Sequence, residues 1–411
     1  MALKVDWPSK RLGELAEFRN GVNYNKSSFG EGVKVVGVSD FQDYTKPRYG
    51  ELEQINPEGV VTERNILRDG DIVFVRSNGN RELIGRSLFI EQPPEEVTHS
   101  AFTIRLRFNS REVYPKFYAY CFRTPIIRQG LTASGGGTNI SNLNQDILNA
   151  LEVPVPPLPV QQRIAGILSA YDELIENSQR RIRILEEMAR ALYREWFVHF
   201  RFPGHEKLPR VASILGDIPK GWEVKPFSEL GSYVNGYAFK PDDWGTEGKP
   251  IIKIKELKAG ITADTPRNPG DGILAKYNVR DGDVLFSWSA DLDTYLWMGG
   301  EGLLNQHLFN IVPFDGLSRA FCFHALKESM TRFRALSLGA TMHHIKRSAL
   351  DQVFTLLAPA ELRKRFDVLV VPMHQQLIAL SKQVQNLRRT RDLLLPRLLS
   401  GQVPIPEEAR I

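Results

Sequence analysis

Cysteine, histidine and long apolar runs are scarce in this chain of 411 residues, and each scarcity excludes a class of protein. Only two cysteines occur, Cys121 and Cys322, in equivalent aromatic segments, so we expect buried thiols and no disulfide. The eight histidines are scattered. The adjacent His343 and His344 point in different directions on a strand or a helix, so we expect no shared metal. Apolar runs of about 18 residues and a secretory signal are both absent, which predicts a cytoplasmic protein without membrane contact.

The usual signatures of catalysis are also missing. The chain has no GxxxxGK[ST] loop, no dinucleotide-binding GxGxxG, no HExxH and no CxxC. One partial match remains, because Asp242, Glu256 and Lys258 have the spacing of a Mg²⁺-dependent nuclease. An acid, any residue and a lysine often occur in this order by chance, and residues 247–249 are a second instance. We therefore expect a non-catalytic protein, with a nuclease as the alternative.

Charge is low overall but concentrated in one place. The formal net charge is +5, which alone argues only weakly for a polyanionic partner. Residues 361–401 contain eight Lys or Arg against three acids, an excess that equals the net charge of the whole chain. This excess fits either a solvated helix face or an anionic partner.

What the chain does contain is a long internal repeat. The run RDGDIVF at residues 68–74 returns as RDGDVLF at residues 280–286. At one constant offset, Trp7, Glu14, Leu15, Phe18, Asn20 and Gly21 match Trp222, Glu229, Leu230, Tyr233, Asn235 and Gly236. Farther along, the matched pairs are Cys121 with Cys322, Ile140 with Ile345, Asp146 with Asp351, and Ile182 with Val384. A repeat about 200 residues long is a whole domain, so the sequence predicts two globular units, each followed by a long helix.

Each globular unit combines short strands with a helix. Apolar runs cut by turn signals occur at residues 33–38, 72–75 and 102–108, and again at residues 250–254, 284–288 and 308–313. One helical stretch interrupts each series, near residues 115–129 and near residues 319–336. We therefore predict an α+β fold with two mixed α/β domains.

The periodicity changes to that of a helix after the proline-rich residues 153–159. Apolar residues then follow a and d spacing, at Ile175, Ile182, Leu185 and Leu192, and in the second copy at Leu377, Leu380, Val384, Leu387 and Leu394. A narrow stripe packs best on another helix, which predicts an antiparallel coiled coil with pseudo-twofold symmetry. The alternative is that each helix packs on its own domain. The predicted boundaries are residues 1–157, 158–205, 206–357 and 358–411.

Polar loops between the strands are the candidate DNA-binding surface. Arg, Asn, Ser and Gly are the residue types that reach base edges and phosphates. The candidates in the first unit are Arg76, Ser77, Asn78, Asn80, Arg81, Gly136, Thr138 and Asn139. Those in the second are Ser287, Trp288, Ser289, His343, His344, Lys346 and Arg347. Divergent loops on a shared scaffold suit two domains that read different half-sites, and ordinary loop drift is the alternative.

These features together resemble the specificity subunit of Type I restriction-modification systems. The matching segments are residues 7–21, the run PPLPVQQRI at residues 156–164 with the long helix after it, and LLLPRLLSG at residues 393–401. The order of domain, helix, domain, helix extends over the whole chain. Val160 stands where the family usually has an acid, and the second boundary, APAEL at residues 358–362, lacks the paired glutamines.

The resemblance implies a role in DNA recognition without chemistry. Each globular unit would be a target recognition domain on double-stranded DNA, reading one half of a bipartite asymmetric site. The helices, with their stripe, would act as spacers and dock two modification subunits, which bind S-adenosylmethionine and methylate adenine N6. Restriction subunits would bring ATP- and Mg²⁺-dependent translocation and cleavage, while this chain carries no cofactor or metal. A stand-alone DNA-binding regulator or decoy is the remaining alternative.

Overall fold

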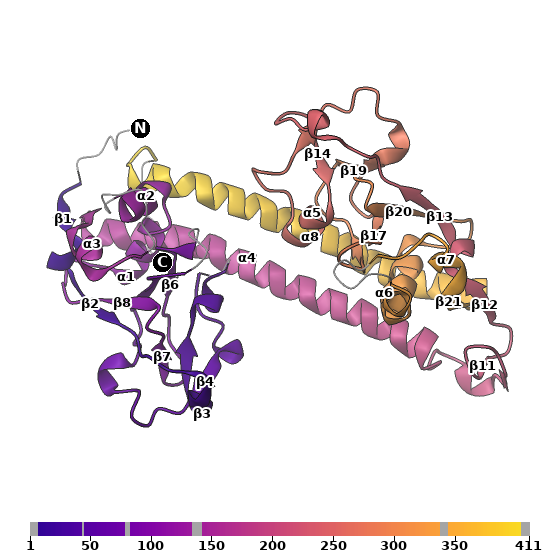
Figure 1. The fold of residues 1–411 in the computed structure, drawn as a ribbon, viewed down its shortest axis with the longest axis horizontal. Coiled ribbons are helices and arrows are strands. Elements are labelled where there is room, and N and C mark those ends of the chain that lie inside the picture. Colours follow the sequence, from indigo (N-terminus) through magenta and orange to yellow (C-terminus); the bar gives the residue numbers. More distant parts are fainter. Residues whose placement is uncertain (1–6, 43–44, 79–82, 134–141, 338–343, 404–411) are drawn as a thin grey trace. The chain divides into compact units, whose positions relative to one another are not determined.

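The computed structural model describes residues 7–42, 45–78, 83–133, 142–337 and 344–403, and the chain divides into two compact units (Figure 1). The first unit comprises Met1–Glu173 and Arg388–Ile411, and the second comprises Leu174–Leu387. Both divisions fall inside long helices, α4 (Leu158–Tyr193) and α8 (Ala360–Leu399). Each unit therefore contains part of both helices. None of the helices in the described ranges is long and apolar enough to cross a lipid bilayer.

The first unit is built on a four-stranded antiparallel sheet in the order β2-β8-β5-β6. Its strands are β2 (Ala16–Asn20), β8 (Thr103–Phe108), β5 (Ile72–Val75) and β6 (Ser87–Phe89). A three-stranded sheet has the order β4 (Glu53–Ile55), β3 (Phe29–Val36), β7 (Val97–His99), and β1 (Ser9–Arg11) pairs with β9 (Glu152–Pro154). The short helices are α1 (Pro115–Cys121), α2 (Pro125–Ala133) and α3 (Gln145–Ala150).

The second unit repeats this topology. Its main sheet has the order β13 (Gly231–Asn235), β20 (Leu308–Pro313), β17 (Val284–Ser287), β18 (Asp293–Leu296). The smaller sheet has the order β15 (Arg267–Asn268), β14 (Lys249–Ile252), β19 (Gly302–Leu304), β16 (Asn278–Val279). Further pairs are β10 (Arg210–Val211) with β11 (Ile218–Pro219) and β12 (Glu223–Pro226) with β21 (Phe354–Leu357). The helices are α5 (Ile254–Ala259), α6 (Arg319–Ala335) and α7 (Ala349–Gln352). The predicted α+β fold and its internal repeat are confirmed.

The duplicated Asp-Gly-Asp run is a structural turn before the central strand of each main sheet. Its glycine has φ +86° in both copies, a conformation that glycine adopts without steric cost. The second aspartate accepts a backbone N–H from three residues earlier, at 2.7 Å for Asp71 and 2.9 Å for Asp283. Asp71 also receives a bidentate pair of hydrogen bonds from Arg107. This motif therefore stabilises the sheet.

The two long helices pack against each other in antiparallel orientation within each unit. In the first unit, Ile164 and Leu168 near the start of α4 share a core with Leu395 and Leu398 near the end of α8. In the second unit, residues at the end of α4 share a core with the start of α8, and the Tyr193 and Phe366 ring centroids are 5.9 Å apart. These contacts agree with the predicted antiparallel helix pair, while the coiled-coil geometry and the four domain boundaries remain predictions.

Burial of the predicted stripe follows the same pattern. Four of its residues are buried, namely Ile175, Leu377, Leu380 and Val384, and the other five are half-buried. Both cysteines are buried and free, as expected. Burial raises the pKa of the Cys322 thiol to about 12, and that of Cys121 rises for the same reason, so neither is a reactive thiolate near neutral pH.

Candidate nucleic-acid interface

The candidate interface lies where the main sheet of each unit meets a loop from later in the chain. In the second unit, the Ile345 backbone N–H donates to the Trp288 carbonyl at 3.0 Å, and Ser289 forms an isolated bridge with His344. In the first unit, the Leu143 N–H donates to the Arg76 carbonyl at 2.8 Å, beside an equivalent bridge. The two units thus share one backbone arrangement, which we call the reading edge. In the first unit it is formed by the segment after β5 and the segment before α3. In the second unit it is formed by the segment after β17 and the segment before α7.

This frame corrects one detail of the sequence alignment. Leu143 occupies the position of Ile345, because both donate to the residue that follows the central strand of the sheet. The predicted match of Ile140 with Ile345 is therefore wrong by three residues. The match of Asp146 with Asp351 used the same offset and is wrong by the same amount. The loops that precede these positions differ in length, so a constant offset cannot be carried through them.

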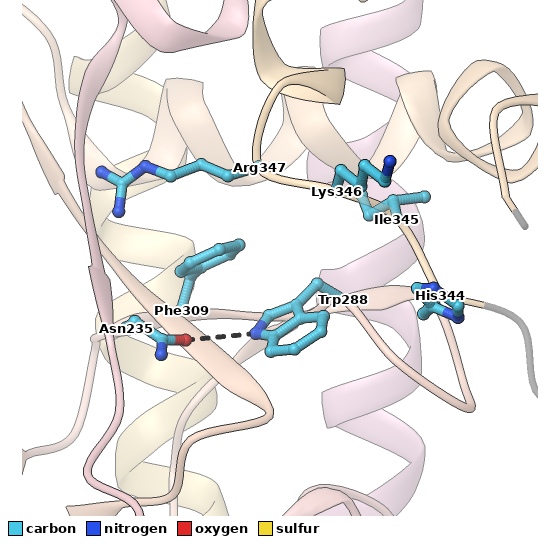
Figure 2. Close-up of a pocket in the computed structure, with 7 residues that line it drawn as sticks. All are labelled: Asn235, Trp288, Phe309, His344, Ile345, Lys346 and Arg347. Atoms are coloured by element: carbon cyan, nitrogen blue, oxygen red, sulfur yellow. Dashed lines mark hydrogen bonds between the residues drawn. The ribbon is translucent and has the colours of Figure 1, made fainter.

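In the second unit, the reading edge encloses a hollow of about 350 Å³ (Figure 2). Its lining residues are Asn235, Trp288, Phe309, His344, Ile345, Lys346 and Arg347. Figure 2 shows the Trp288 indole N–H pointing at Asn235, and it donates to the Asn235 Oδ1 at 3.3 Å. The Arg347 guanidinium carbon lies 5.8 Å from the centre of the Phe309 ring. The hollow thus combines an aromatic floor with polar groups at its rim.

Positive charge dominates this rim. Lys346 and Arg347 are both exposed, and within the described ranges neither forms an ion pair with a carboxylate. Cationic side chains beside a half-buried indole suit a nucleic acid, because they can contact phosphates or base edges while the ring packs on a sugar or base.

A glycine directly after the first strand of each main sheet packs against the backbone just before the neighbouring strand, β8 or β20. A Cβ on Gly21 would lie 2.2 Å from the His99 carbonyl oxygen, and one on Gly236 would lie 2.1 Å from the Asn305 carbonyl oxygen. Only glycine permits this approach, which explains why the Asn-Gly pair is present in both units. The asparagine before each glycine contacts the reading edge through its side chain, which hydrogen-bonds Gln145 in the first unit and Trp288 in the second.

In the first unit, Arg76 stands where the second unit has Trp288, and side-chain amides stand where it has Arg347. The Asn20 Oδ1 accepts a hydrogen bond from the Gln145 Nε2 at 3.1 Å. Asn142 and Asn144 are exposed beside them, and the Asn144 side chain also caps α3 by accepting from the Ile147 N–H at 2.8 Å. Sequence reasoning missed these four amide residues, although the duplicated Asn-Gly pair was a signal for the first.

The predicted DNA-binding residues are spread unevenly over this frame. Trp288, His344, Lys346 and Arg347 line the hollow, and Arg76 occupies the position equivalent to Trp288. Ser77 and Asn78 are half-buried beside it. Ser287 is fully buried and donates to the Ser289 carbonyl at 3.1 Å, so its hydroxyl supports the loop from within. The candidates outside the described residues are Asn80, Arg81, Gly136, Thr138, Asn139 and His343.

Two of the three residues of the possible nuclease site, Glu256 and Lys258, have structural partners instead, and Asp242 is exposed. Glu256 is buried, accepts the Lys253 backbone N–H at 3.0 Å and accepts the Thr265 hydroxyl at 3.3 Å. Lys258 forms an ion pair with Asp291 at 2.7 Å, and this lysine is the main cause of the lowered pKa of that carboxyl. Across the part of the chain that the structure describes, no three acidic, His or Cys side chains are placed to hold a metal ion.

Comparison with known proteins points to one family. The model of the Type I restriction modification DNA specificity domain matches residues 4–187 and 219–354. The MjaIX specificity subunit of Methanocaldococcus jannaschii is 24% identical, over 98% of this chain and 94% of that protein. The HindI specificity subunit of Haemophilus influenzae is 23% identical, over 83% and 88%. The S subunit structure from M. genitalium has a TM-score of 0.58 at 16% identity and covers 97% of each chain.

Proposed function

Because this chain belongs to the family of Type I restriction modification DNA specificity domains, we propose that it selects the DNA sequence on which a restriction-modification complex acts. The observation that carries the proposal is the duplication itself, since both matched regions contain the same sheet and the same reading edge. The chain supplies recognition, and catalysis belongs to its partner subunits. The nuclease alternative is not favoured, because Glu256 and Lys258 are occupied in structural contacts.

The two reading edges support an asymmetric bipartite target. One edge presents Asn20 and Gln145, and the other presents Trp288 and Arg347 on the same backbone frame. Side chains with different donors and acceptors read different bases in the major groove. Each domain therefore reads one half-site, and the two half-sites differ in sequence.

The partners are double-stranded DNA and the other subunits of the complex. Two methyltransferase subunits that bind S-adenosylmethionine would take the adenine out of the stack for methylation at N6. Restriction subunits would use ATP and Mg²⁺. The docking surfaces we favour are the apolar residues that remain exposed on the long helices, namely Leu158, Leu174, Ile184 and Met188 on α4 and Val368, Leu369 and Leu393 on α8. The buried part of the predicted stripe then holds the helices in place.

The test is single-molecule sequencing for N6-methyladenine in cells that express this chain together with its cognate methyltransferase subunit. Cells with the methyltransferase subunit alone are the control. We expect a bipartite methylated motif only when this chain is present. If the two proteins associate but no motif forms, the chain is a decoy or part of an inactive system. A chain that binds its site tightly without the methyltransferase subunit is a regulator instead.

A matched pair of variants connects this motif to the hollow. Lys346→Ala with Arg347→Ala removes two exposed cations from the rim, and Lys220→Ala removes an exposed lysine of the same unit outside the lining of the hollow. We expect the first variant to lose methylation at the motif, whereas Lys220→Ala retains it. Equal losses in both variants would contradict a role of the hollow in DNA binding.

A further inference from the structure

We propose that the two reading edges specify different bases at equivalent positions of the two half-sites: Gln145 reads an adenine, and Arg347 reads a guanine. This inference rests on the proposed function and adds the identity of the base that each domain selects. It follows from the hydrogen-bonding groups that each edge leaves available.

Gln145 and Arg347 occupy equivalent positions, because the backbone hydrogen bonds before them are the same in the two units. Gln145 lies two residues after Leu143, and Arg347 lies two residues after Ile345, whose N–H groups make the same frame hydrogen bond. Asn20 and Asn235 both end the first strand of the main sheet and both precede the close-packed glycine. Each edge therefore has an asparagine at the end of the first strand and a variable side chain two residues after the frame hydrogen bond.

The first edge offers a donor next to an acceptor. The Gln145 NH₂ group uses one of its two N–H donors on the Asn20 carbonyl, which leaves the second N–H and the carbonyl of the same Gln145 amide available. Exchanging the O and N positions in both amides reverses the bond but again leaves Gln145 with a donor and an acceptor. Among the described residues, neither group has another side-chain hydrogen bond. A donor beside an acceptor matches adenine, which presents N7 as an acceptor and N6 as a donor in the major groove.

The second edge offers donors alone. The Trp288 indole can only donate, so it fixes the Asn235 carbonyl as its acceptor and leaves the Asn235 NH₂ as a donor. The Arg347 guanidinium is exposed beside the hollow and carries donors alone. The two parallel N–H donors of one guanidinium match guanine, whose N7 and O6 are both acceptors. The two edges thus have different base preferences, because Gln145 in one is replaced by Arg347 in the other.

The experiment exchanges the variable side chain and determines the methylated motif by single-molecule sequencing. The full chain is co-expressed with its cognate methyltransferase subunit, with either Gln145→Arg or Arg347→Gln. Arg111→Gln is the matched control, because it removes an exposed arginine of the first unit away from both edges. Association with the methyltransferase subunit is checked by size-exclusion chromatography. Both edge positions lie at the surface, so we expect all three variants to fold and assemble.

We expect Gln145→Arg to replace one A·T pair by G·C in one half-site, and Arg347→Gln to remove the guanine preference in the other half-site. The preference at the affected position should change by about tenfold or more, while Arg111→Gln keeps the motif. A wild-type complex without any motif overturns the proposed function and this inference with it. A wild-type motif that Gln145→Arg leaves unchanged overturns the inference alone. An Arg347→Gln variant that weakens methylation without changing the motif shows a phosphate contact and also overturns it.

Discussion

At the scale of single residues, Gly21 and Gly236 determine how closely the end of the first strand of each main sheet can approach the segment before β8 or β20. Each lies so close to a carbonyl oxygen of the crossing segment that a Cβ would overlap it. Neither has a positive φ, so the constraint comes from packing and leaves the backbone unstrained. The same explanation does not hold for every glycine of the chain, because Gly166 in α4 has open space around it.

This contrast gives a stability prediction. Gly236→Ala should lower the free energy of unfolding by about 1–3 kcal/mol, because its Cβ would lie 2.1 Å from the Asn305 carbonyl oxygen and the strands must separate. Gly166→Ala is the control, and it should raise stability by about 0.5–1 kcal/mol because glycine is unfavourable in a helix interior. Denaturant unfolding of both variants checks the signs. Equal stability of Gly236→Ala and the wild type would contradict the close approach.

At the scale of secondary-structure elements, each unit packs a long helix against a shorter helix of the domain. The polar side chains at this contact differ between the two units, although they occupy equivalent positions. In the first unit, Asp172 on α4 lies 3.8 Å from Arg123, accepts the Tyr120 hydroxyl at 2.7 Å and pairs with Arg391 on α8 at 2.5 Å. In the second unit, the Nε2 atoms of His324 on α6 and His374 on α8 are 3.1 Å apart. A charged cluster has thus been replaced by a neutral pair.

The histidine pair makes the second unit sensitive to acid. Burial, with the nearby His374 and Arg190, lowers the pKa of His324 to about 3, and burial lowers that of His374 to about 4. An unfolded histidine has a pKa of about 6.5. As the pH falls below about 6.5, the unfolded chain binds protons that the folded pair does not, so stability decreases until about pH 3 to 4.

Replacing the histidine pair by the arginine and aspartate of the first unit should reduce the loss of stability at low pH. We expect the double variant His324→Arg with His374→Asp to lose less stability than the wild type between pH 7.5 and pH 5. His199→Asn is the control, because His199 is exposed and should leave the pH dependence unchanged. Urea unfolding across this range is the measurement. An unchanged slope in the double variant would show that other groups cause the acid sensitivity.

Sequence patterns predicted the elements better than the contacts between them. The repeat, the mixed domains and the long helices follow from periodicity and from constant offsets such as that between Asn20 and Asn235. The reading edge could not be predicted, because Leu143 and Ile345 reach it through loops of different length. Ser287 resembled a DNA contact in the sequence but is buried, since its burial depends on the strand pairing around it.

At the scale of the whole molecule, the division between the two units falls inside helices. α4 continues through the division at residues 173–174, and α8 continues through the one at residues 387–388. A helix is cooperative along its length, because each residue added to it contributes a hydrogen bond to the residues before it. Unfolding of one unit therefore removes helical support from the other.

Breaking both helices at the division should uncouple the units. We expect Glu173→Pro with Arg388→Pro to separate thermal unfolding into two transitions, because a proline in a helix interior costs about 3 kcal/mol. The matched variant Glu173→Ala with Arg388→Ala replaces the same exposed residues and should keep a single transition. Calorimetry distinguishes them. Two well-separated transitions in the wild type would mean that the continuous helices do not couple the units.

The backbone frame of the reading edges has a consequence for how the protein can change over time. The frame is closed by main-chain groups, the N–H of Leu143 with the carbonyl of Arg76, and the N–H of Ile345 with the carbonyl of Trp288. Side chains at Gln145 and Arg347 take no part in these bonds, so natural selection can exchange them at little cost in folding. A host could thus acquire a new DNA target sequence by single substitutions, one domain at a time, while the fold stays the same.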